Sequence, residues 1–209
     1  MADFSFIMTI FFLLLGPVKI IPAFARITRD SELSLKRGLA IKATVLATAI
    51  CAIVALLTES FVDKYQLSLP AIQITGGLIL LISALTTLFP RRESSAPVGK
   101  QPSAWQLAMS PMATPVIVTP AGIAAIMIFV LLTERGAEQA PGGYQVIFLA
   151  LAIVMALNFL VMYVNDLILR IPGLLLVLQL FGSVLVVVQG ALAVQALLYG
   201  YHNVVGRAP

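Results

Sequence analysis

The sequence predicts an all-α membrane protein, in which six transmembrane helices form two inverted three-helix repeats and the first and fourth helices are broken. Three observations predict this fold: the composition, the six long apolar segments, and the prolines and glycines inside two of them. The 209-residue chain is 60% hydrophobic and 11% charged, whereas a soluble domain carries roughly 25% charged residues. We therefore expect the lipid bilayer to surround most of the chain.

Six apolar segments are each long enough for a transmembrane helix, which needs about 20 residues. Charged or turn-rich connections separate them. The segments are Phe4 to Ala25, Gly38 to Val62, Leu69 to Phe89, Leu107 to Thr133, Tyr144 to Leu169, and Leu174 to Tyr201.

The basic residues predict an orientation. The net charge of +4 would suit a nucleic-acid partner, but we expect none, because the basic residues lie in short connections, as membrane topology requires. By the positive-inside rule, the richer side is cytoplasmic and both termini are outside. The first, third and fifth connections hold Arg26, Arg29, Lys36, Arg37, Arg91, Arg92, Lys100 and Arg170, and the opposite side holds Lys64, Arg135 and Arg207.

The first apolar segment carries residues that interrupt helices. Gly16, Pro17, Lys19 and Pro22 all lie in its second half. Proline lacks an amide donor and clashes with the carbonyl four residues earlier, so we expect interruptions at Gly16-Pro17 and at Pro22. Freed backbone groups at membrane depth are tolerated only where protein or a water-filled cavity satisfies them. A broken helix of this kind indicates a transporter binding site.

A second interruption is expected in the fourth segment, around Pro111, Pro115 and Pro120-Ala121-Gly122. The third and sixth segments also correspond, since Gln73 to Gly77 and Gln179 to Ser183 share Gln-x-x-Gly before an aliphatic run. Halves of three helices each must have opposite orientations, which is the inverted-repeat plan of many secondary transporters.

The chain is thus expected to form one transmembrane domain over residues 1–209. Its first repeat covers residues 1–89, a cytoplasmic loop covers residues 90–104, and the second repeat covers residues 105–209.

The two breaks predict a substrate site. The amides at the start of each second half-helix attract an anionic group such as a carboxylate, and small neighbouring residues leave room for a compact ligand. The alternatives are proline kinks that only shape packing, an asparagine that joins helices, and glycines that let helices approach. The candidate substrate-binding residues are Gly16, Pro17, Lys19, Pro22, Thr119, Pro120, Gly122, Gly76, Gly77 and Asn158.

Lys19 has two interpretations. Intramembrane charges mark functional sites, and this ammonium could hold a carboxylate or replace a coupling cation. Alternatively it snorkels, because Arg26 is seven residues on, about 10 Å away along a helix. Asp166 is four residues before Arg170 and favours a helix-end pair with it, although a pair with Lys19 is open too.

Enzymatic function is not expected. The single histidine, His202, lies in the terminal tail, and the single cysteine, Cys51, lies inside an apolar segment. No Ser-His constellation, metal-binding cluster or nucleotide-binding P-loop is present in the sequence. We therefore expect no catalytic residues, no metal site and no cofactor.

Several stretches resemble the MarC family. Leu13 to Phe24 resembles its first-helix signature, roughly Asp-Pro-x-Gly-Asn-x-Pro-x-Phe, and Ser110 to Ile123 resembles its second, Pro-x-x-x-Pro followed by Gly-Pro-Gly-Ala-Ile. Ile74 to Gly77 is similar to its third-helix Gly-Gly, and Val194 to Gly200 to its final helix. The chain departs from the family at Gly16, Lys19, Ile20 and Thr119, where the family has aspartate, glycine, asparagine and glycine.

The resemblance implies a six-helix protein of the bacterial inner membrane, in a family that includes transporters of neutral amino acids such as glycine and alanine. We accordingly expect a secondary transporter of small neutral amino acids or related small metabolites, working by alternating access around the paired breaks. The coupling ion (proton or sodium), the direction of transport and the oligomeric state stay open. The alternative function is a channel or a non-transporting membrane partner protein.

Overall fold

The computed structural model describes residues 4–28, 31–89, 108–135, 143–171 and 173–206. Every regular element in these ranges is helical, and no strand occurs among them, so the predicted all-α class is confirmed. The elements are α1 (Phe4–Leu15), α2 (Pro17–Ile27), α3 (Leu33–Lys64), α4 (Leu69–Leu88), the π-helix η1 (Ala108–Ile117), α6 (Pro120–Arg135), α7 (Gly143–Tyr163), α8 (Asn165–Leu169) and α9 (Leu174–Val205).

Five stretches in the described residues are long and apolar enough to cross a membrane. The fourth predicted segment is not one of them, because its chain is divided between η1 and α6, and the apolar part of α6 covers only Pro120–Thr133. The predicted loop 90–104 lies outside the described residues. The five spans are Phe4–Ile27, Leu33–Lys64, Leu69–Leu88, Gly143–Tyr163 and Leu176–Val205.

The first span consists of two helices separated by one residue. α1 ends at Leu15, Gly16 is extended with φ −80° and ψ 172°, and Pro17 starts α2. Proline suits the first position of a helix, where no amide donor is needed. A Cβ atom on Gly16 would overlap the carbonyl oxygen of Phe12. Glycine is therefore required where the chain turns back against the last turn of α1.

The predicted interruption at Pro22 is wrong. Pro22 lies inside α2, which continues to Ile27. Its ring removes only the hydrogen bond to the carbonyl four residues earlier, that of Val18. Transmembrane helices tolerate such a loss where neighbouring elements satisfy the freed group.

The fourth segment is interrupted at Val118 and Thr119. η1 has the wide turn of a π-helix, and it ends with a bond from the amide of Val118 to the carbonyl of Ala113 at 2.9 Å. Pro111 and Pro115 lie within this π-helix rather than terminating it. α6 then begins at Pro120. π-turns are rare and frequently occur at functional sites.

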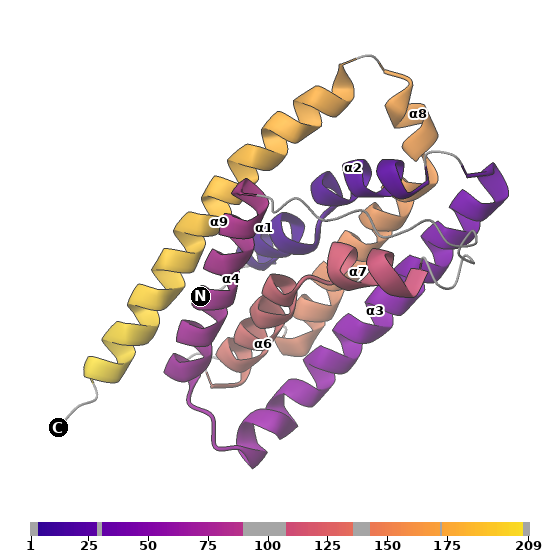
Figure 1. Cartoon of the computed structure of the whole chain (residues 1–209). Helices are drawn as coiled ribbons and strands as arrows, with labels where there is room; N and C mark the ends of the chain where they lie inside the picture. The colour runs from indigo at the N-terminus through magenta and orange to yellow at the C-terminus, as the bar shows by residue number, and fades with distance from the viewer. Residues whose placement is uncertain (1–3, 29–30, 90–107, 136–142, 172, 207–209) are drawn as a thin grey trace.

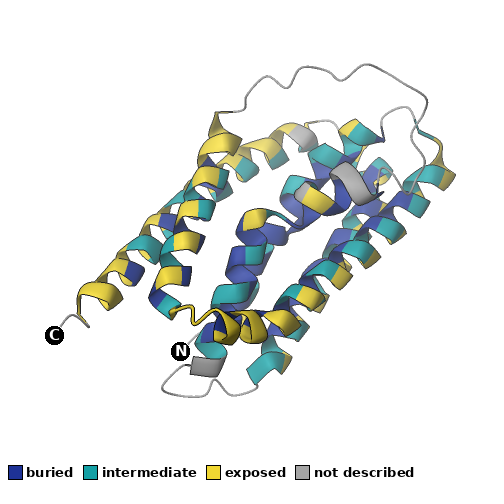
Figure 2. Ribbon diagram, turned by 60° about the horizontal axis from the view of Figure 1, so that its bottom comes forward, coloured by how far each residue is buried: buried dark blue, intermediate teal, exposed yellow. Residues whose placement is uncertain are grey.

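The helices pack into a bundle with α4 and α9 side by side on one flank and α3 on the other (Figure 1). α1, α2, α6 and α7 lie between these flanks and contain most of the buried residues (Figure 2). α4 and α9 approach closely because Gly77 faces the carbonyl of Ala193 and Gly200 faces the carbonyl of Pro70. Small residues at such contacts are typical of helix pairs in membranes.

Candidate functional site

The break after α1 leaves carbonyl groups without partners inside the helix, since the last four carbonyls of any helix lack them. Two side chains from elsewhere in the chain bind these carbonyls. The amide nitrogen of Asn158, on α7, donates to the carbonyl of Leu15 at 2.7 Å. The hydroxyl of Thr119 donates to the carbonyl of Leu14 at 3.4 Å. The end of α1 is thus held by α7 and by the second interrupted segment.

Thr119 also caps α6. Its hydroxyl oxygen accepts a hydrogen bond from the amide of Gly122 at 3.0 Å, which satisfies one of the donors at the start of that helix. A Cβ atom on Gly122 would overlap the side chain of Leu15. The two interrupted segments therefore contact each other at their breaks, through Leu14 and Leu15 on one side and Thr119 and Gly122 on the other.

Asn158 carries a polar atom that the protein leaves unused. The residue is completely buried, and its carbonyl oxygen Oδ1 has no hydrogen-bond partner among the described residues. Leaving a buried acceptor unsatisfied costs about 1–3 kcal/mol, and such groups are few in folded proteins. Because the other end of the same amide binds Leu15, this acceptor lies beside the first break.

Lys19 binds a neutral group inside the bundle. Its ammonium donates to Oε1 of Gln189 on α9 at 2.8 Å. Gln189 is completely buried and donates in turn from Nε2 to the carbonyl of Leu80 on α4 at 3.1 Å. Lys19 thereby joins α2 to α9, and Gln189 joins α9 to α4. Sequence reasoning did not identify Gln189, although an amide within the apolar Leu174 to Tyr201 segment was the available signal.

The two predicted partners of Asp166 are wrong. Its carboxylate pairs with Lys36 on α3, with a distance of 2.7 Å, and not with Arg170 or Lys19. No described carboxylate pairs with Lys19. The start of α3 and α8 line the same pocket, and Lys36 reaches across it to Asp166.

The other candidate residues make different contacts. Gly76 faces Ile128 of α6, where a Cβ atom would lie 2.8 Å from its Cδ1, and Gly77 faces α9. Pro17 is buried, Pro22 is half-buried and Pro120 is exposed. The structure thus brings Gly16, Thr119, Gly122 and Asn158 together at the end of α1, and it uses the two glycines of α4 for helix packing.

A metal site has no support in the described residues, where no three histidine, cysteine, aspartate or glutamate side chains gather. What the arrangement offers is polar recognition: an unpaired amide oxygen at Asn158, an ammonium at Lys19, and the amide ends of α2 and α6. The amide oxygen suits a hydrogen-bond donor such as an ammonium, and the Lys19 ammonium and the helix amides suit a negative group.

Comparisons with known proteins identify relatives that are integral membrane proteins. Residues 1–201 match the family described as MarC family integral membrane protein. The chain is 22% identical to the UPF0056 inner membrane protein YhgN of Escherichia coli over 164 residues, 77% of each chain. It is 31% identical to a UPF0056 membrane protein of Methanocaldococcus jannaschii over 121 residues, 56% of this chain and 58% of that protein. No solved structure matches.

Proposed function

Given that this chain belongs to the MarC family of integral membrane proteins, we propose that it is a multi-pass secondary transporter of small neutral amino acids, such as glycine and alanine, or of related small metabolites. It resides in the inner membrane with both termini outside, and it works by alternating access around its two helix breaks. The observation that carries the proposal is the direct contact between the breaks, where Asn158 and Thr119 bind the last carbonyls of α1.

The polar groups around the breaks match the two ends of an amino acid. The free Oδ1 of Asn158 would accept a hydrogen bond from the substrate ammonium. The substrate carboxylate would bind the ammonium of Lys19, displacing the neutral Gln189, since an ion pair with good geometry is stronger than a bond to an amide. The amides at the starts of α2 and α6 would favour the same negative end.

The breaks are in close contact, so the proposed transport cycle has to separate them. Gly122 lies against Leu15 so closely that one added methyl group would overlap. Substrate entry therefore requires Leu15 and Gly122 to separate, and this is the movement that alternating access would supply. The inverted repeat of residues 1–89 and 105–209 would let the same movement open the site to either side of the membrane.

The test is uptake of labelled glycine and alanine by proteoliposomes under imposed proton or sodium gradients. We expect Asn158→Ala to lower uptake at least tenfold, the effect of losing about 1.4 kcal/mol of substrate binding. Asn203→Ala is the matched control, because Asn203 is exposed at the far end of α9. Absence of uptake by the wild type under every gradient, or single-channel currents in planar bilayers, would contradict the proposal and favour the channel or partner-protein alternative.

A further inference from the structure

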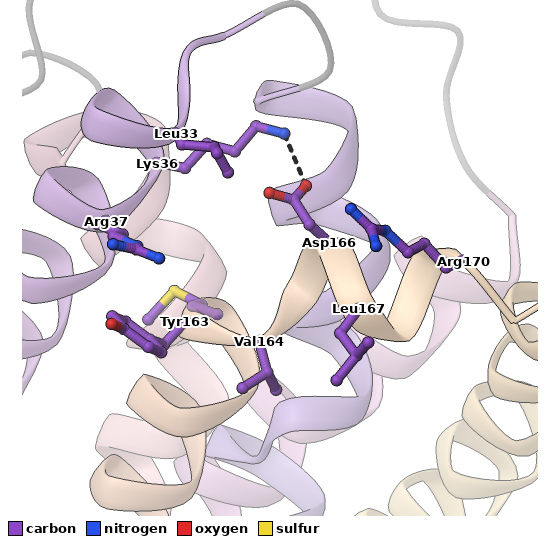
Figure 3. Close-up of a pocket in the computed structure, with 9 residues that line it drawn as sticks. Leu33, Lys36, Arg37, Tyr163, Val164, Asp166, Leu167 and Arg170 are labelled. Carbon is purple, nitrogen blue, oxygen red and sulfur yellow. Dashed lines mark hydrogen bonds and ion pairs between the residues drawn. The ribbon is translucent and has the colours of Figure 1, made fainter.

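A separate pocket of about 330 Å³ lies at the end of the bundle where α3 begins and α7 and α8 meet. Three elements line it: the first turn of α3, the last turn of α7, and α8 with the residue that follows it (Figure 3). Lys36 and Arg170 belong to the first and fifth connections, the ones predicted to be cytoplasmic. The pocket is distinct from the breaks, because none of its lining residues belongs to α1, α2 or α6.

The pocket carries excess positive charge. Its lining contains Lys36, Arg37, Arg170 and one carboxylate, Asp166, so three positive charges face one negative charge. Asp166 forms an ion pair with Lys36, with 2.7 Å between Oδ1 and Nζ. The side chain of Lys36 is 17% exposed and that of Asp166 is 37% exposed. The guanidinium of Arg37 lies over the ring of Tyr163, 5.2 Å from its centre, which leaves its edges free to donate. Arg170 forms no ion pair with a described residue.

Two arginines beside one pocket are suited to a phosphate group. A guanidinium presents paired donors that match phosphate oxygens and stays charged at every physiological pH. Figure 3 shows Lys36 and Arg170 on either side of Asp166, and Arg37, from the same helix as Lys36, above Tyr163. The positive side chains therefore enclose the pocket from both helices.

The rim of the pocket is apolar. Leu33 and Leu167 line it, yet they are 60% and 64% exposed. A soluble phosphate would gain nothing from exposed leucines, whereas a phospholipid places its acyl chains beside them. Tyr163 is also consistent with the membrane interface, where aromatic residues gather.

We propose that this pocket binds the phosphate of an anionic phospholipid such as phosphatidylglycerol, with Arg37 and Arg170 as its ligands and the acyl chains along Leu33 and Leu167. Basic pockets between transmembrane helices on the cytoplasmic side bind lipid head groups in this way. Asp166 holds Lys36 away from the lipid and limits the positive charge, so it weakens the site.

The experiment is native mass spectrometry of the full-length protein in detergent with an equal mixture of phosphatidylglycerol and phosphatidylethanolamine. We expect the wild type to retain phosphatidylglycerol preferentially, and Arg37→Gln and Arg170→Gln each to reduce this retention about fivefold. Lys64→Gln is the control: it removes the same charge from the other end of α3 and should leave retention unchanged. Thermal unfolding of each variant verifies that it is folded.

Asp166→Asn should change lipid retention in the opposite direction from the arginine variants. It raises the charge facing the lipid and should increase phosphatidylglycerol retention, whereas a site that only loses its Lys36 bridge would not bind more lipid. The proposal is overturned if the wild type does not distinguish the two lipids, or if Lys64→Gln reduces retention as much as Arg170→Gln. Binding of inorganic phosphate without retention of phosphatidylglycerol would assign the pocket to a soluble anion and refute the lipid.

Discussion

Asn158 donates a hydrogen bond to the carbonyl of Leu15 at 2.7 Å, which joins the middle of α7 to the residue where α1 stops. The partners are 143 residues apart in sequence. This bond satisfies a carbonyl that the break would otherwise leave unpaired inside the bundle, and it holds the acceptor Oδ1 of Asn158 next to the break. The side chain that stabilises the end of α1 is therefore also the one proposed to bind the substrate ammonium.

Asn158→Asp should destabilise the protein by at least about 1–3 kcal/mol, because it removes the amide donor that binds the Leu15 carbonyl and keeps an unpaired buried acceptor. The measurement is unfolding by titration with a denaturing detergent. Asn203→Asp serves as the control, since its bond to Gln73 is exposed and long at 3.4 Å. Equal effects of the two substitutions would mean that the bond to Leu15 contributes nothing particular.

Gly122→Ala should also destabilise the protein, by about 1–3 kcal/mol, because the new methyl group overlaps Leu15. Leu15→Ala removes the atoms that clash. The loss of stability in the double variant should therefore be smaller than the sum of the losses in the two single variants. The difference, the interaction energy, should be about 0.5–3 kcal/mol. Strict additivity in the double-mutant cycle would show that Leu15 and Gly122 are not in steric contact.

Gln189→Leu should destabilise the protein more than Lys19→Leu combined with Gln189→Leu. In the single variant the Lys19 ammonium keeps its charge and loses its partner, a loss of about 1.5–3 kcal/mol for a bond to a charged group. In the double variant no charge needs a partner, although the Leu80 carbonyl does. The order of the unfolding midpoints checks this, and a less stable double variant would contradict it.

Gly77→Ala should weaken the pairing of α4 with α9, since a Cβ atom there would lie 2.9 Å from the carbonyl oxygen of Ala193. Gly190→Ala, in α9, meets nothing within 4 Å. It should leave stability unchanged or raise it by up to about 1 kcal/mol, the difference in helix propensity. Thermal unfolding in detergent compares the two variants. An unchanged melting temperature for Gly77→Ala would contradict the close contact between α4 and α9 at this glycine.

Lys19→Gly introduces the residue that the first signature of the MarC family has at this position. We expect the variant to lose binding of the substrate carboxylate and to raise the KM for glycine in proteoliposomes, about tenfold for 1.4 kcal/mol. Lys19→Arg, which keeps the charge, should retain more activity. An unchanged KM in Lys19→Gly would assign this lysine to the contact with Gln189 alone.

The sequence predicted the membrane class, the helical fold and the family because each depends on local composition or on a short motif. Apolar length defines a span wherever a helix is continuous, and five stretches meet that criterion. The extended residue at Gly16 and the start of α6 at Pro120 also follow from local backbone chemistry. The inverted repeat stays a prediction.

The contacts between helices could not be predicted in the same way. Lys36 and Asp166 are 130 residues apart, and Lys19 and Gln189 are 170 apart. No local spacing rule joins residues at such separations. The nearby pair of Asp166 and Arg170 fitted the helical spacing, yet Lys36 reaches Asp166 from the start of α3. The continuity of α2 through Pro22 likewise depends on surroundings that a proline in sequence does not reveal.

Gly16 lies between two half-helices that are hydrogen-bonded to different parts of the bundle. Asn158 ties α1 to α7, and Lys19 ties α2 to α9, which Gln189 ties to α4. If α7 and α9 shift relative to each other, either one of these ties ruptures or rotation accumulates in the backbone between them. That backbone is short, running only from Leu15 to Lys19, and its one residue outside a helix is a glycine. Gly16 is thus the backbone position at which rotation would accumulate between a half-helix bonded to α7 and a half-helix bonded to α9.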